Sequence, residues 1–178
     1  MPYQGACFAC KGAWTESSCV TDHGICLRSG VYNECLAQGI KPIIGCEVYV
    51  APRTRFDKLA KIDSSPYHLV LLCENNEGYQ NLIKLVSAAY TEGFYSKPRV
   101  DVELLEKYHN GLICLSACLA GEIPRKLTNG DYEAAKQTAL KYRDIFGRDN
   151  YFIELQNHKF ADQAENIAYA YKAFTRNR

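Results

Sequence analysis

The chain has 178 residues, which is enough for one domain with a buried core. Hydrophobic residues make up 47% of it and charged residues 23%, and no apolar run reaches the ~20 residues of a membrane-spanning helix. The net charge of +1 excludes a strong overall field for nucleic acid, so basic character is expected only locally, at Lys97, Arg99, Arg125 and Lys126.

Residues 1–20 follow neither the period of a strand nor that of a helix, and they stay unassigned. A short helix is expected over Val31–Gln38, because Gly39 and Pro42 follow it. From residue 40 onward short apolar runs alternate with helical patterns, which predicts βα units around a parallel sheet or barrel. Four strands, too few to close a barrel, are expected at Ile43–Val50, Tyr67–Glu74, Gly111–Ala117 and Asn150–Gln156.

Helical spacing of apolar residues predicts an amphipathic helix over Tyr79–Tyr90. A second helix is expected to begin after Asp131, as N-cap, and to stop at Gly147. The pattern over Ala161–Phe174 is also helical, but it has no stop signal before the end of the chain. The stretch Arg53–Ser65 is predicted to be a polar surface loop.

The nine cysteines do not indicate a disulfide framework, because their number is odd and Cys46, Cys73 and Cys114 lie inside apolar runs. A reducing compartment fits this pattern. Residues 1–20 contain no basic start followed by an apolar stretch, so no secretion signal is predicted in them. We therefore expect a cytoplasmic protein that does not contact a membrane.

Four side chains of metal-binding types stand in or beside the predicted strands: His23, Glu47, His68 and Cys118. Glu47 lies inside an apolar run, and an isolated buried carboxylate is costly, so it needs a cation or another partner. In a parallel α/β fold the strand ends meet at one rim, where residues far apart in sequence share an ion. Imidazole, carboxylate and thiolate together suit zinc best, with manganese or iron as alternatives.

Ordinary structural interpretations compete with these ligand hypotheses. A single histidine beside an apolar run is usually hydrogen-bonded rather than metal-bound, and Thr21–Gly24 also fits a turn in which Asp22 accepts backbone hydrogen bonds. Cys7-x-x-Cys10 has no second pair, so a structural role is favoured over zinc, and His109 is expected to be exposed. No P-loop, nucleophile elbow or dinucleotide fingerprint occurs, so nucleotide-loop chemistry is not predicted.

Several long motifs follow one another in a fixed order: Gly39–Arg53, Tyr67–Leu72, Asn81–Ser87, Gly93–Arg99, Gly111–Pro124 and Tyr151–Gln156. Together they resemble the amino-terminal domain of the bacterial DNA polymerase III alpha subunit, which is a polymerase and histidinol phosphatase (PHP) domain. The resemblance covers about residues 20–178 and is weak or absent before them.

This resemblance implies an α/β fold, an incomplete distorted (β/α) barrel of PHP type with parallel strands, outer helices and a metal cluster at one rim. It implies that His23, Glu47, His68 and Cys118 are metal ligands. It also implies that Asp22 contacts one of these ligands and not the metal itself. Zinc or manganese at a partial site, and a site without metal, are both compatible with these residues.

The sequence also departs from the family pattern. The family's opening His-x-His pair and the acidic residue after it have no counterpart before Thr21, its closing Asp-x-His pair would follow residue 178, and Asn157-His158 does not replace it. We therefore expect residues 21–178 to be a partial PHP domain, truncated at both ends, whose cluster binds one ion weakly or none. An open barrel would also expose apolar strand edges and promote self-association.

The first functional hypothesis is a structural or weakly metal-binding part of a replicative polymerase alpha subunit, in which DNA synthesis depends on palm carboxylates that these residues lack. Its partners would be the rest of the alpha subunit and a proofreading exonuclease subunit, with only indirect DNA contact. The alternative is a free-standing metal-dependent phosphoesterase. A third hypothesis is a scaffold in which Glu47 and His68 pair with each other and bind no metal.

Overall fold

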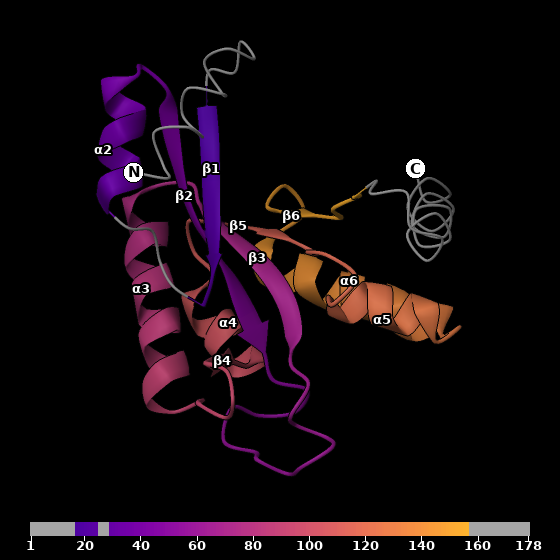
Figure 1. The fold of residues 1–178 in the computed structure, drawn as a ribbon. Coiled ribbons are helices and arrows are strands. Elements are labelled where there is room, and N and C mark those ends of the chain that lie inside the picture. The colour runs from indigo at the N-terminus through magenta and orange to yellow at the C-terminus, as the bar shows by residue number, and fades with distance from the viewer. Residues whose placement is uncertain (1–16, 25–28, 157–178) are drawn as a thin grey trace.

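The structure is a computed structural model that describes residues 17–24 and 29–156. In these residues one sheet runs in the order β1 (Ser17–His23), β2 (Lys41–Val50), β3 (Tyr67–Cys73), β5 (Leu112–Leu115) and β6 (Tyr151–Phe152), and β4 (Arg99–Val100) pairs with β2. The helices are α2 (Ser29–Ala37), α3 (Asn76–Thr91), α4 (Val102–Tyr108), α5 (Glu122–Thr128) and α6 (Tyr132–Phe146). Figure 1 shows the strands turning from an upright β1 to a β5 that lies across the view, so the sheet is strongly curled.

The sheet is mixed, and the expectation of an all-parallel sheet is wrong. β1 and β4 run parallel to β2, and β6 runs parallel to β5, but β3 is antiparallel to both of its neighbours. A parallel pairing of β2 with β3 would need a crossover, usually a helix, and the connection over residues 51–66 has none. Because β1 and β6 stand at opposite ends of the strand order, the described sheet is open.

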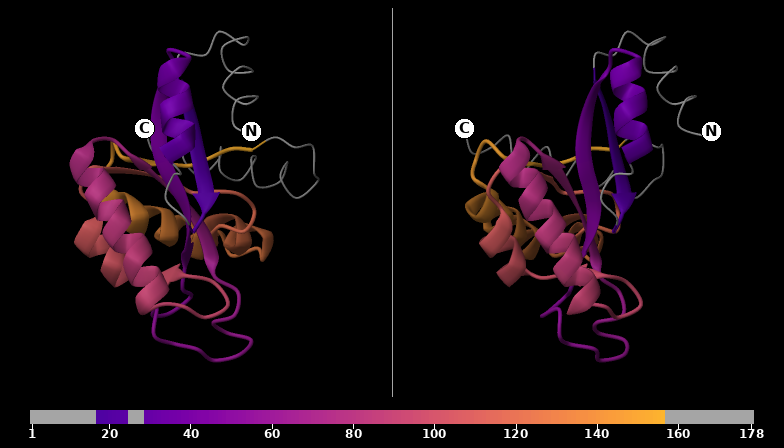
Figure 2. Two further views of the ribbon diagram at one scale, coloured as in Figure 1. Left: turned by 60° about the vertical axis from the view of Figure 1, so that its left-hand side comes forward. Right: turned by 90° about the vertical axis from the view of Figure 1, so that its left-hand side faces the viewer.

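One face of the sheet carries the hydrophobic core. The register pairs Cys46 with Leu71 and Val48 with Leu69, and all four are buried on this face. Helices supply the other half of the core, with Leu82 and Leu85 from α3, Leu104 and Leu105 from α4, and Ala135, Ala139 and Tyr142 from α6. Figure 2 shows these helices from two further directions. Since strand side chains alternate, the residues between the core positions point to the opposite face.

The three predicted helices that lie within the described residues are confirmed, with small shifts at their ends. Asp131 caps α6, because its side chain accepts a hydrogen bond of 3.0 Å from the backbone N–H of Ala134, and Gly147 stops the helix. Helix α3 begins at Asn76, earlier than expected, because the Asn75 side chain caps it by accepting from the N–H of Gly78 at 3.0 Å. Helix α2 covers most of the range predicted for it.

Other elements were not expected from the sequence. They are β1, β4, α4 and α5, and the strand predicted over residues 150–156 is only the two residues of β6. Residues 17–20, which the sequence left unassigned, belong to β1. The helix expected over Ala161–Phe174 and the pair Cys7–Cys10 lie outside the described residues. None of the helices in the described ranges has the length and hydropathy of a transmembrane segment.

The loop over residues 53–65 is more than a polar surface loop, because buried charges fix it to the domain. Arg99 is fully buried and donates hydrogen bonds of 2.9 to 3.1 Å to four backbone carbonyl oxygens, three of which belong to this loop. Arg55 pairs with Asp101 at 3.0 Å and with Glu92 at 2.7 Å. Asp63 is also fully buried and binds Arg53. We call these residues the anchor cluster.

Candidate metal centre

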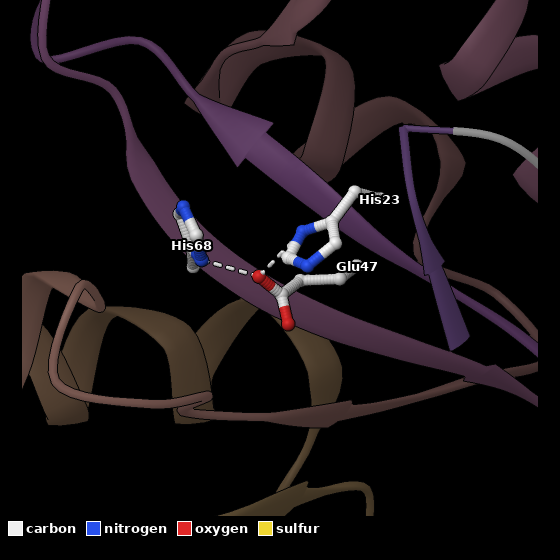
Figure 3. Close-up of side chains that lie close together, drawn as sticks. All are labelled: His23, Glu47 and His68. Atoms are coloured by element: carbon white, nitrogen blue, oxygen red, sulfur yellow. Dashed lines mark ion pairs between the residues drawn. The ribbon is translucent and has the colours of Figure 1, made fainter. Parts of the chain in front are cut away.

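The register of three strands brings together His23, Glu47 and His68. The parallel pairing of β1 with β2 places His23 beside Glu47, and the antiparallel pairing of β2 with β3 places His68 beside Tyr49, two residues further along the same face. Ligand atoms of the two histidines and the glutamate all lie within 4.8 Å of one another. Figure 3 shows both imidazoles turned toward the Glu47 carboxylate.

The Glu47 carboxylate is the centre of this group. Nδ1 of His23 lies 3.1 Å from its Oε1 atom, and Nδ1 of His68 contacts the same oxygen. The Glu47 side chain is only 14% exposed, and Oε1 accepts no hydrogen bond from the described residues. Two imidazole nitrogens therefore lie close to one buried oxygen without a well-directed hydrogen bond to it, which leaves the oxygen open to a further partner.

The electrostatic surroundings favour a neutral imidazole at His68. Burial lowers the pKa of His68, the nearby His23 and Arg125 lower it further, and the Glu47 carboxylate opposes the shift. A histidine binds a metal ion in its neutral form. The side chain of His68 is 20% exposed and that of His23 is 56% exposed, so the cluster is open to solvent on the His23 side.

Cys118 lies at the edge of this cluster. Its Sγ atom is 3.6 Å from Nδ1 of His68, while the three-residue cluster itself does not include it. The preceding residue, Ala117, has a left-handed backbone with φ of 62°, which costs a residue with a side chain on the order of 1 kcal/mol. This strained turn after β5 directly precedes Cys118, whose thiol lies beside His68.

Asp22 contacts backbone rather than an imidazole. Its Oδ1 atom accepts a hydrogen bond of 2.8 Å from the N–H of His23, as the turn interpretation of Thr21–Gly24 expects. The N–H of Gly24 in turn donates to the carbonyl oxygen of Glu47 at 2.8 Å. Both contacts fix the end of β1, so the same short motif forms a turn and presents His23 to Glu47.

Tyr49 is a member of the site that the sequence reasoning missed. Its ring is buried, and its centroid lies 6.1 Å from that of His23 in a stacked arrangement and 5.2 Å from that of His68, edge to face. It therefore supports both imidazoles. The signal was present in the alternation of β2, because residues 47 and 49 of one strand share a face.

Comparison with known proteins shows the family to which the chain belongs. A family model for the PHP domain matches residues 6–158. The chain is 49% identical over 160 residues to the DNA polymerase III subunit alpha of Treponema pallidum, with 89% of this chain and 14% of that protein covered. It is 44% identical to the same subunit of Deinococcus radiodurans, covering 85% and 12%, and 44% identical to that of Thermus aquaticus, covering 88% and 13%. The chain thus spans only 12% to 14% of the length of these relatives. It belongs to the PHP domain family and is similar, within that family, to DNA polymerase III alpha subunits.

Proposed function

We propose that this chain is the metal-binding PHP domain of a bacterial replicative DNA polymerase alpha subunit, and that His23, Glu47 and His68 hold one divalent ion. The observation that carries this proposal is the buried Oε1 atom of Glu47, which two imidazole nitrogens contact and no described residue hydrogen-bonds. A cation between these atoms would satisfy the oxygen and use the nitrogen lone pairs at the same time.

The donor set suits zinc, with manganese as the alternative. Two imidazoles and one carboxylate are a common zinc set, and Cys118 adds a thiol that can complete it from beside His68. Bound there, the ion supplies Lewis-acid chemistry to an oxygen of a ligand. The protein's own part is to hold the imidazoles against Tyr49 and to keep the carboxylate buried.

In the intact polymerase we assign this domain a structural role in DNA replication, in the cytoplasm and with DNA contacted only indirectly. The similarity to DNA polymerase III alpha subunits supports this role, and the rest of the alpha subunit and a proofreading exonuclease subunit are the proposed partners. Nucleotidyl transfer is expected to depend on carboxylates outside these 178 residues.

A second function, metal-dependent phosphoester hydrolysis, has one observation in its favour. The His23 side is solvent-exposed, and catalytic zinc sites keep one position open, whereas purely structural sites are closed. In the scaffold alternative, the contacts of Glu47 with His23 and His68 are simple ion pairs. Metal binding separates that alternative from both others, and hydrolysis separates the two metal-binding functions.

The test is elemental analysis of the purified chain for zinc, manganese and iron, with His68→Ala as the site variant. His109→Ala is the matched control, because His109 lies against Phe146 of α6, away from the cluster. We expect stoichiometric metal in the wild type and in the control, and its loss in His68→Ala. Metal-free wild-type protein that is folded, or equal metal in His68→Ala, would contradict the proposal.

A further inference from the structure

Of the four residues expected to give local basic character, three form hydrogen bonds or ion pairs with other groups of the protein. Arg99 donates to backbone carbonyl oxygens. Arg125 donates to Ser65 and Pro66 at 2.9 to 3.2 Å. Lys126 pairs with Glu122 at 2.7 Å. In the described residues Lys97 forms no ion pair or hydrogen bond through its side chain, and its ammonium group lies over an aromatic ring.

That ring is Tyr49 of the metal centre. The Nζ atom of Lys97 lies 5.4 Å from the Tyr49 ring centroid, and the same ring packs on both His23 and His68. A single side chain therefore separates the ammonium group from both imidazoles. An aromatic face holds a cation without neutralising it, so the charge of Lys97 stays available to a ligand.

The backbone around Lys97 is fixed to the end of β1. Lys97 sits in a tight turn, in which the N–H of Tyr95 donates to the Lys97 carbonyl oxygen at 3.0 Å and Ser96 has a φ of 59°. The next residue, Pro98, is buried and packs so closely on Gly24 that a Cβ atom there would lie 2.9 Å from Pro98 Cγ. Since Gly24 follows His23 directly, this packing ties the turn to one of the proposed ligands.

We propose that Lys97 positions an anionic ligand at the metal centre, and that the ligand is an oxyanion of the phosphate class. This proposal rests on the proposed metal site. Lys97 and His23 are both exposed, so a ligand that reaches the metal from solvent at the His23 side meets the ammonium group. Lysine binds phosphate as a point charge, and a divalent ion together with one fixed ammonium gives an oxyanion two cationic contacts.

The matched control for Lys97 lies on the other side of the sheet. Lys107 of α4 also holds its Nζ atom over a tyrosine, at 5.2 Å from the Tyr108 ring centroid. Helix α4 packs on the core face, where its leucines join the hydrophobic cluster. Lys107→Met therefore removes the same charge and the same kind of ring contact as Lys97→Met, but away from the metal centre.

The experiment measures inorganic phosphate binding to the manganese-loaded chain by paramagnetic broadening of the phosphorus NMR signal, after manganese binding itself has been measured by electron paramagnetic resonance. We expect Lys97→Met to raise the phosphate dissociation constant by about tenfold, the loss expected for one charge-assisted hydrogen bond. Manganese affinity should stay within about twofold of the wild type, because Lys97 is not a metal ligand. Lys107→Met should change neither value, and Lys97→Arg should restore most of the phosphate affinity.

Unchanged phosphate affinity in Lys97→Met, with manganese still bound, would overturn the role of Lys97 while leaving the metal site in place. A loss of manganese affinity in Lys97→Met would also overturn it, because Lys97 would then support the site and not the ligand. Absence of manganese binding in the wild type would instead refute the proposed metal site, and the inference would fall with it.

Discussion

The anchor cluster and the candidate metal centre both bury charge beside the same sheet, but they differ in how their polar atoms are satisfied. In the anchor cluster, Arg99 reaches four carbonyl oxygens and Arg55 reaches three carboxylates. In the metal centre, Glu47 Oε1 is buried without a hydrogen bond although two imidazoles contact it. A buried charge that the protein satisfies by itself needs no external partner, whereas one that it leaves unsatisfied is open to an external ion.

The largest effect is expected in the anchor cluster. Asp101 is buried, pairs with Arg55 and caps α4 by accepting from the N–H of Leu104 at 3.2 Å. Asp101→Ala should lower the free energy of unfolding by about 3–5 kcal/mol, because it leaves the buried Arg55 guanidinium short of a partner. Urea unfolding measures this change.

Glu103→Ala is the control for that measurement. Glu103 also pairs with Arg55, but its side chain is 73% exposed, so its loss should cost less than about 1 kcal/mol. Equal losses in the two variants would show that burial does not decide the strength of these pairs, and the contrast with the metal centre would lose its basis.

The opposite behaviour is expected at Glu47. Glu47→Gln should weaken zinc binding by more than about 100-fold. Removing a residue that only supports a metal ligand lowers metal affinity by at most about this factor, so a larger loss indicates a ligand. Without metal, the same change should leave the free energy of unfolding unchanged or higher, since it removes an unsatisfied buried charge. Competition with a chelating dye gives the first quantity and urea unfolding of the metal-free chain gives the second. Marked destabilisation of the metal-free variant would favour the scaffold alternative.

The stability of the protein is expected to depend on pH through Glu122. Like the charges of the anchor cluster, the Glu122 carboxylate has partners within the protein. Burial alone would raise the pKa of Glu122, but Lys141, Lys126 and the Tyr142 hydroxyl outweigh it, and the pKa lies below its ordinary value of 4.5. The unfolded chain therefore binds this proton more readily, so the stabilisation is present above pH 4.5 and is lost as the pH falls through the lower, folded-state pKa. Stability curves of Glu122→Gln should lack this part of the acid-side loss, and a curve that superimposes on the wild type would contradict the assignment.

The smallest effect is expected at Cys118, beside the cluster. Cys118→Ser should lower zinc affinity by about tenfold, because a soft thiolate suits zinc, and should change manganese affinity much less. The ratio of the two affinities is the informative measurement. A loss as large as that of Glu47→Gln would make Cys118 a full ligand.

The sequence was a good guide to the residues of the site and a poorer guide to their supports. Residue type and family resemblance both pointed to His23, Glu47, His68 and Cys118, and the structure brings the first three together, with Cys118 beside His68. Tyr49 escaped notice, because an aromatic residue in a strand looks like any core residue until the register is known. The metal-ligand role itself stays a prediction.

The fold shows the same division. Helix α6 was predictable because its cap, apolar stripe and stop are all local signals. The direction of β3 was not, because it depends on how the chain crosses from β2. The loop over residues 53–65 was predicted to be a polar surface loop, because the sequence alone does not distinguish a buried arginine or aspartate from an exposed one. Only the three-dimensional contacts of Arg99 and Asp63 reveal their burial.

The central claim is that the cluster around Glu47 is completed by a metal ion. The most direct test is the free energy of unfolding of the wild type and of Glu47→Gln, each measured without metal and with free zinc at 100 times the wild-type dissociation constant. The account predicts that zinc stabilises the wild type by about 2.7 kcal/mol and the variant by less than about 0.4 kcal/mol. Equal stabilisation of both proteins, or none of the wild type, would contradict it.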